Sequence, residues 1–155
     1  MSERRGTPYN GRPALVVEVV WGDITQAEGD VHLAGHYVGV LPQNAEWQLD
    51  KAISSREGQK PGRLLISELT KRGALRGDLG EVVFFPWTRN RIVAVAGMGG
   101  LGTFGEEQLR AMARSVATTI GLLPERTTLT SVLRGGRSRA LNFGNALQMA
   151  RRDLF

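Results

Sequence analysis

The sequence predicts a three-layer α/β/α domain with a mixed, mostly parallel sheet. Apolar, β-branched runs alternate along the chain with stretches whose apolar residues recur at helical spacing. The length of 155 residues suits one domain, and the contents of 41% hydrophobic and 23% charged residues are typical of globular proteins. We therefore expect a flexible lead-in over residues 1–13 and a single domain over residues 14–155.

Apolar runs predict the strands of the sheet. The five runs cover residues 14–21, 31–41, 77–87, 91–97 and 127–133. The short connection TRN joins the third run to the fourth and predicts an antiparallel hairpin. The other strands are separated by helical stretches, which favours parallel pairing.

Four stretches are predicted to be helical. They are residues 44–54, residues 63–75, residues 106–120, and a weaker helix over 140–155 that Gly144 interrupts. We expect Asn44 to cap the first helix, and Thr103 with Glu106 to form a capping box at the start of the third. Gly121 is predicted to end that third helix in a left-handed conformation.

Composition excludes several classes of site. The chain has no cysteine, so disulfides, thiolate nucleophiles and cysteine-based zinc sites are excluded. His32 and His36 fall in a predicted strand, where residues four apart are about 13 Å from each other, so they do not share a metal ion. No serine stands in a nucleophile elbow, and we expect no metal or cofactor.

The ends and the charge of the chain indicate its surroundings. No apolar run approaches the length that spans a bilayer, and the N-terminus lacks the apolar stretch of a secretory signal, so we expect a cytoplasmic protein without membrane contact. The net charge of +5 favours anionic partners.

A glycine-rich segment follows the fourth predicted strand. Gly97, Gly99 and Gly102 form a G-x-G-x-x-G pattern between this strand and the third helix. Such glycines can let the main chain approach a phosphate at a helix N-terminus, or they can only supply the positive φ angles of a tight turn. The acids Glu106 and Glu107 follow directly, and no acidic residue ends the next strand, which disfavours a dinucleotide-binding oxidoreductase fold.

Two short motifs resemble those of macro domains, the ADP-ribose-binding α/β modules. They are VEVVWGDIT at 17–25 and GLGTFG at 100–105. The resemblance implies that Asp23 contacts adenine and that Ile24 lies beside the base. It also implies that Gly100, Gly102, Thr103, Phe104 and Gly105 surround the phosphates, with Phe104 against the distal ribose. From the residues alone, an Asx turn is an equal alternative for Asp23.

The segment after the second strand departs from common macro domains. It contains Asn44, but neither an asparagine pair nor a glycine run. The order of segments over most of residues 15–133 instead resembles the macro-like N-terminal domain of the leucine aminopeptidase family and related bacterial modules that precede CHAT proteases. The peptidase residues of that family belong to a separate domain, so no peptidase activity is expected.

These observations favour a non-catalytic, macro-like domain that binds a nucleotide-type ligand similar to ADP-ribose, or a protein partner. It would be the sensing or scaffolding part of a larger bacterial system, with an effector domain or a second copy of the chain as further partners. The candidate ligand-binding residues are Asp23, Ile24, Asn44, Gly97, Gly99, Gly100, Gly102, Thr103, Phe104 and Gly105.

Two alternatives remain open. An ADP-ribosyl hydrolase would need a group that positions water, for which Asn44 and His36 are the candidates. A pure interaction module would use the arginines near the C-terminus to bind protein or nucleic acid. These are Arg134, Arg137, Arg139, Arg151 and Arg152. No aromatic residues are interleaved with them, so nucleic acid is the less favoured partner.

Overall fold

A mixed sheet forms the centre of the protein. The computed structural model describes residues 22–55, 63–123 and 128–132, and within them four strands pair in the order β2-β3-β1-β4. The strands are β1 (Val31–Tyr37), β2 (Val82–Pro86), β3 (Ile92–Gly99) and β4 (Leu129–Ser131). β1 is parallel to both β3 and β4, and β2 is antiparallel to β3. The predicted fold class and the predicted hairpin are therefore confirmed.

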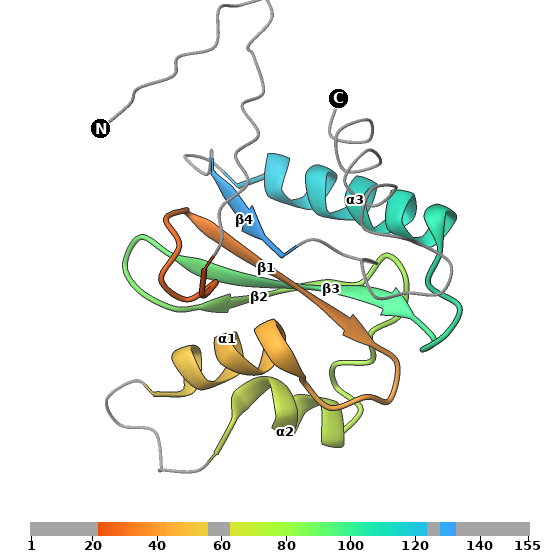
Figure 1. The fold of residues 1–155 in the computed structure, drawn as a ribbon, viewed down its shortest axis with the longest axis horizontal. Helices are drawn as coiled ribbons and strands as arrows, with labels where there is room; N and C mark the ends of the chain where they lie inside the picture. The colour runs from red at the N-terminus through yellow and green to blue at the C-terminus, as the bar shows by residue number, and fades with distance from the viewer. Residues whose placement is uncertain (1–21, 56–62, 124–127, 133–155) are drawn as a thin grey trace, which may run out of the picture.

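Helices cover both faces of the sheet (Figure 1). α1 (Asn44–Ser54) and α2 (Leu65–Lys71) lie on one face, and α3 (Glu106–Gly121) lies on the other. The strand predicted over 14–21, the helix predicted over 140–155 and the C-terminal arginines lie outside the described residues.

The sheet separates two hydrophobic clusters. One lies under α3 and includes Val31, Leu33, Met98, Phe104, Leu109, Met112 and Val116. The other lies under α1 and α2 and includes Ile24, Ala34, Leu49, Ile53, Ile66, Val93 and Val95. Successive residues of a strand point to opposite faces, so β1 and β3 contribute apolar residues to both clusters.

Both predicted N-terminal caps are wrong. Gln43, which has an extended backbone, is the residue before α1. Asn44 is the first residue of α1, and its φ is positive, at 51°. α3 begins after Gly105, whose amide donates to Gln108 Oε1 at 3.0 Å. The Thr103 hydroxyl instead donates to the Gly100 carbonyl at 2.8 Å, because residues 100–103 close a turn before the helix starts.

The end of α3 also differs from the prediction. Gly121 is the last helical residue and is not among the residues with positive φ. Leu122 follows in a right-handed conformation, and its amide donates to the Thr119 carbonyl at 3.3 Å. A tightened last turn therefore replaces the expected left-handed glycine.

Candidate functional site

The carboxyl ends of β1 and β3 lie side by side and define the candidate site. His36 pairs with Gly97 and Tyr37 pairs with Gly99, so Met98 is an extra residue that shifts the register. From this edge the chain runs from β1 into α1 and from β3 into α3 (Figure 1). Ligands of open α/β sheets bind beyond the carboxyl ends of the strands, which is the position of this edge.

Gly97 and Gly99 are occupied by contacts within the protein. The Gly97 amide donates to the Glu81 carbonyl at 2.8 Å, and the Gly99 amide donates to the Gly77 carbonyl at 2.9 Å. A Cβ on Gly97 would overlap the carbonyl oxygen of Asp78. The segment 77–81, predicted as the start of a strand, is therefore a turn packed on the end of β3. These contacts alone account for glycine at position 97.

The turn over residues 100–103 is exposed. The Thr103 amide donates to the Gly100 carbonyl at 3.2 Å, and Gly102 has a φ of 90°, as a type II turn requires. Leu101 is 67% exposed, and a Cβ on Gly102 would meet open space. Within the described residues, the amides of Gly100, Leu101 and Gly102 donate to no protein acceptor. This turn therefore presents free donors at the start of α3.

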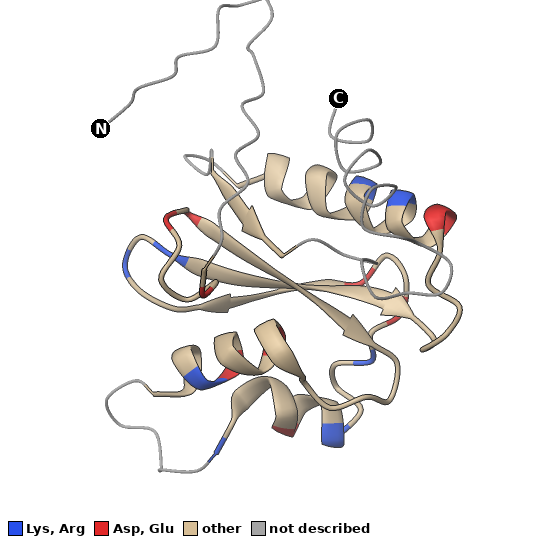
Figure 2. Cartoon of the chain, in the orientation of Figure 1, with Lys and Arg blue, Asp and Glu red and all other residues tan. Residues whose placement is uncertain are grey.

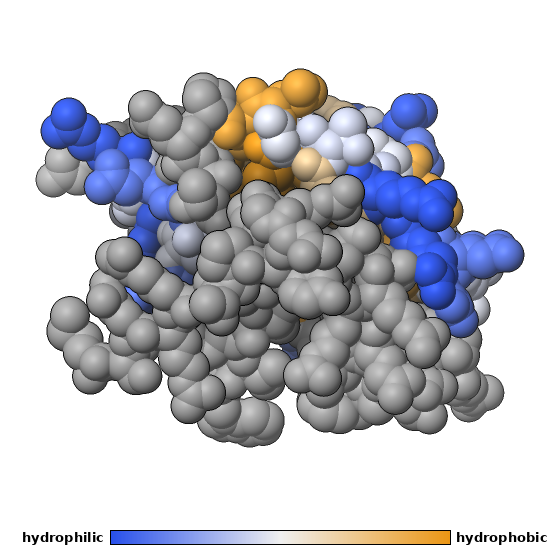
Figure 3. Space-filling view, turned by 90° about the horizontal axis from the view of Figure 1, so that it is seen from above, coloured by the Kyte–Doolittle hydropathy of each residue, from blue (hydrophilic) through white to orange (hydrophobic). Residues whose placement is uncertain are grey.

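Charges beside the turn are partly compensated. Glu106 opens α3, and its carboxylate lies 2.7 Å from the Arg110 guanidinium one turn later. Figure 2 shows this order along α3, with acidic residues in the first turn and basic residues in the turns behind it. Viewed from above, the surface over these turns is hydrophilic, whereas hydrophobic surface lies toward the other end of α3, where Leu122 is 78% exposed (Figure 3).

Phe104 lies in the core and not at the surface. Its side chain is 2% exposed in the cluster under α3, and its ring meets the edge of Tyr37 with centroids 6.1 Å apart. Only the main chain of Phe104 is therefore placed for contact with a ligand at the edge.

Asp23 forms the Asx turn that its sequence context allows. Its Oδ1 accepts hydrogen bonds from the Thr25 amide and the Thr25 hydroxyl, both at 2.8 Å. These two bonds lower the pKa of Asp23 below its ordinary value of 3.8, and the charge of Lys51 lowers it further. The side chain remains exposed, whereas the neighbouring Ile24 is buried in the cluster under α1 and α2.

The described contacts do not join Asp23 to the glycine turn. Residues 22–30 lead into the amino end of β1, where the Ile92 amide donates to the Asp30 carbonyl at 2.9 Å. The glycine turn follows the carboxyl end of β3 (Figure 1). Participation of both features in one binding site therefore stays a prediction.

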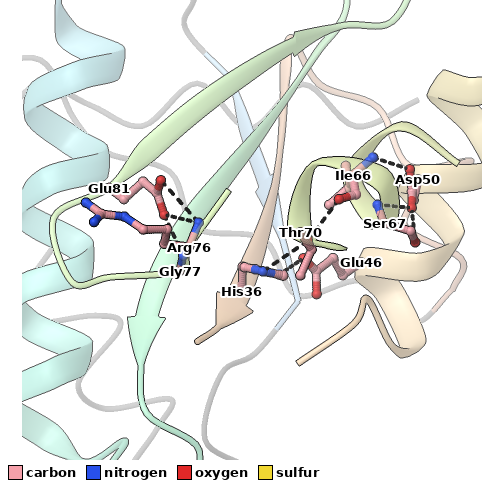
Figure 4. A network of polar contacts seen from close by, with 9 residues as sticks. All are labelled: His36, Glu46, Asp50, Ile66, Ser67, Thr70, Arg76, Gly77 and Glu81. Carbon is pink, nitrogen blue, oxygen red and sulfur yellow. Dashed lines mark hydrogen bonds and ion pairs between the residues drawn. The ribbon is translucent and has the colours of Figure 1, made fainter. Parts of the chain in front are cut away.

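His36 is buried and its ring is fully engaged. Nδ1 lies 2.6 Å from Glu46 Oε1 on α1, and Nε2 lies 3.3 Å from the Thr70 hydroxyl on α2 (Figure 4). Asn44, the other candidate for positioning water, is exposed at the start of α1. The two candidates for hydrolysis thus differ: only Asn44 reaches the surface.

Two acids of α1 were missed as functional groups at the level of sequence. Glu46 and Asp50 are both buried, one helical turn apart. Asp50 accepts hydrogen bonds from the Ile66 amide at 2.8 Å, and from the Ser67 amide at 2.9 Å and its hydroxyl at 2.7 Å (Figure 4). It therefore caps α2 from a neighbouring helix. The available signal was their spacing of four, which places them on one face beside Leu49 and Ile53.

His32 is the second buried histidine of β1. Its Nε2 lies 3.0 Å from the Ala27 carbonyl, and its ring meets the edge of Trp87 with centroids 4.9 Å apart. Nδ1 is buried without a hydrogen-bond partner. Burial lowers the pKa of His32 below 6.5, because a charged ring would lose its hydration there. His32 is therefore a neutral core residue.

The described part of the chain offers neither a metal-binding cluster nor a helix able to cross a membrane. No group of three or more histidine or acidic residues there is arranged to hold a metal ion. In the same part, none of the helices has the length and apolar character needed to cross a membrane.

Known proteins resemble this chain in structure but not in sequence. No protein-family model and no curated protein sequence matches it. The macrodomain of DarG from Thermus aquaticus superimposes with a TM-score of 0.65 at 15% identity, covering 87% of each chain. The macrodomain of DarG from Mycobacterium tuberculosis gives a TM-score of 0.65 at 13% identity, covering 85% of each chain. At such identities the likeness establishes the fold, which confirms the resemblance to macro domains.

Proposed function

We propose that this chain, which has the macrodomain fold, binds a nucleotide-type ligand related to ADP-ribose at the carboxyl edge of its sheet and does not hydrolyse it. One observation carries the proposal: an exposed glycine turn with free amides stands directly before α3 on a sheet of this fold. The relationship to the leucine aminopeptidase-type and CHAT-linked domains, and a cytoplasmic sensing or scaffolding role in a larger bacterial system, are part of the same proposal.

The chemistry of the turn suits a diphosphate. The free amides at 100–102 precede α3, whose first amides have no acceptor inside the helix, and the helix dipole adds positive potential at this end. The absence of a side chain at Gly102 leaves room for the main chain to approach phosphate oxygens. The pairing of Glu106 with Arg110 reduces the repulsion that an anion would meet.

The state of His36 supports a binding role over hydrolysis. Activation of water needs a base that reaches the ligand, and both ring nitrogens of His36 are engaged inside the protein. Asn44 reaches the surface, but an amide is not a base at neutral pH.

The contact of Asp23 with the base or another polar group is a separate part of the proposal, because Asp23 lies on the segment that leads into the amino end of β1 and not at the glycine turn. Thr25 occupies its Oδ1, and the carboxylate as a whole is exposed, so Oδ2 is available as an acceptor. The burial of Ile24 leaves its main chain, and not its side chain, for such a contact.

Calorimetry with ADP-ribose, ATP and NAD tests the proposal. Gly102→Glu should abolish binding by repelling the phosphates, whereas Gly102→Ala carries the same backbone strain without the charge and should bind measurably. Gly121→Glu is a control for net charge, because it adds the same acid in open space at the far end of α3. Asp23→Ala should weaken binding if the carboxylate contacts the ligand.

The other outcomes favour the alternatives. If the wild-type chain gives no heat with any of the three nucleotides, the interaction module becomes the better explanation. Release of ADP-ribose from a modified protein by the wild type would establish hydrolysis and overturn the non-catalytic role.

A further inference from the structure

The hydrogen-bond partners of His36 indicate which of its two ring nitrogens carry a proton. The Thr70 hydroxyl has one proton and lies 2.8 Å from the Ile66 carbonyl, which can only accept. With its proton directed at the Ile66 carbonyl, that hydroxyl accepts at its 3.3 Å contact with His36 Nε2, which assigns a proton to Nε2. The 2.6 Å contact between Nδ1 and Glu46 Oε1 needs one more proton between them.

The position of Glu46 places that second proton on the histidine. Glu46 stands in the first turn of α1, where the helix dipole stabilises a carboxylate. Its side chain is 8% exposed, and its Oε1 is the oxygen that faces His36. A carboxylate in the first turn of a helix is a suitable counter-ion for a cationic donor at this distance.

Among the described residues, the other charged groups near the ring are paired elsewhere. Asp50, one turn along α1, is engaged by α2. On α2, Glu68 pairs at the surface with Lys71 and Arg72. From the remaining side, the main chain of Gly77 packs on the ring, and the Arg76 and Asp78 side chains beside it pair with each other at 3.1 Å.

We propose that His36 is held as an imidazolium by Glu46 and serves as a positioning residue for the edge of the sheet. His36 occupies the last buried position of β1 and contacts α1 through Glu46 and α2 through Thr70. The connection from β1 to α1 begins at Val38 and borders the glycine turn. The Val38 amide in this connection donates to the Gly99 carbonyl at 3.0 Å. The effect on ligand binding rests on the proposed function, whereas the protonation state of His36 does not.

The chain contains its own reference for this proposal. His32 lies four residues earlier on the same face of β1 and is also buried, but within the described residues its Nδ1 has no hydrogen-bond partner and no carboxylate pairs with its ring. The two histidines of the chain should therefore be in opposite states, His32 neutral and His36 cationic.

NMR of the full chain labelled with ¹⁵N-histidine tests the protonation state at pH 7. His36 should show two protonated ring nitrogens and His32 only one, with His32→Gln used to assign the signals. A single protonated nitrogen on His36 would overturn the proposal, whether or not any ligand binds.

Matched variants test the counter-ion and the positioning role. Glu46→Gln should remove one ring proton from His36, whereas Asp50→Asn makes the same chemical change one turn away and should leave both. Thr70→Val removes the hydroxyl that accepts from Nε2–H but keeps the size of the side chain, whereas Thr70→Ser keeps the hydroxyl and removes a methyl group. Comparing the two variants distinguishes loss of the hydrogen bond from loss of packing. Retention of both ring protons in Glu46→Gln would refute Glu46 as the counter-ion.

Ligand affinity gives the second readout. In folded Glu46→Gln, the dissociation constant for ADP-ribose should rise by about 2- to 30-fold, the range typical of residues that act without touching a ligand. An unchanged constant together with the lost proton would refute the positioning role alone. If the wild type binds no nucleotide while the NMR result is as expected, the proposed function fails and the ion pair stands.

Discussion

Replacing Gly97 by alanine should destabilise the fold strongly, because the main chain of another segment occupies the space of the new methyl group. The added carbon would overlap the Asp78 carbonyl oxygen and lie 2.6 Å from the Asp78 carbonyl carbon and 2.7 Å from that of Gly77. The first of these carbon–carbon distances is about 0.9 Å inside the ~3.5 Å of an ordinary contact. Neither obstacle is a flexible side chain that could rotate away.

The cost of this change follows from what must move. The segment 77–81 is held by hydrogen bonds of the Gly97 and Gly99 amides, and by the Glu81 carboxylate, which accepts from the amides of Arg76 and Gly77 (Figure 4). Displacing it loses several of these bonds in addition to the overpacking, and the two effects together should cost about 3–4 kcal/mol of unfolding free energy.

Gly102→Ala and Gly121→Ala are the matched controls. Alanine at Gly102 meets no atom but must adopt a φ of 90°, which costs about 1–2 kcal/mol. Alanine at Gly121 meets no atom and needs no positive φ, so this variant should be as stable as the wild type or more stable by ~0.5 kcal/mol at most. Urea denaturation followed by circular dichroism measures all three. A Gly97→Ala protein no less stable than Gly102→Ala would refute the packing explanation of Gly97.

Three further predictions concern stability. Because burial lowers the pKa of His32 below 6.5, the unfolded chain binds more protons at this residue, so the contribution of His32 to the unfolding free energy should be retained above about pH 6.5 and lost as the pH falls below it; in urea titrations between pH 7.5 and 5, the stability of the wild type should fall relative to that of His32→Gln as the pH decreases. Asp50→Ala leaves three donors of α2 without their acceptor and should cost ~3 kcal/mol by the same assay, with Asp50→Asn costing about half; equal stability of wild type and Asp50→Ala would contradict the capping role. Gln108→Ala should lower stability by about 0.5–1 kcal/mol because Gln108 accepts from the Gly105 amide, whereas Thr103→Ala should leave the helicity of α3 unchanged; the reverse order would restore Thr103 as the cap.

The central strands and the longest helices could be predicted from sequence because their signals are local. β3 is apolar along its whole length, β1 is apolar apart from its two histidines, and the apolar residues Leu109, Met112 and Val116 recur at helical spacing in α3. The caps failed because they depend on where a turn closes. Thr103 was a suitable cap by type, but the 100–103 turn uses its hydroxyl first.

The candidate site was harder to predict because its contacts join distant segments. Glu46 and Asp50 look like solvent-facing acids of an amphipathic helix, and their partners lie ten residues before Glu46 and sixteen or more after Asp50. Gly97 shows the same limit. A phosphate and the carbonyl of Asp78 both require a position without a side chain, and only the structure distinguishes the two.

The division of the core by the sheet has a consequence for how this protein can evolve. The cluster under α3 and the cluster under α1 and α2 share no residue. Effects of mutations at sites without common neighbours usually add, so stabilising changes in one layer can offset harmful ones in the other. Mutations near the glycine turn that change its binding preference and lower stability can thus be offset by stabilising mutations in the opposite layer.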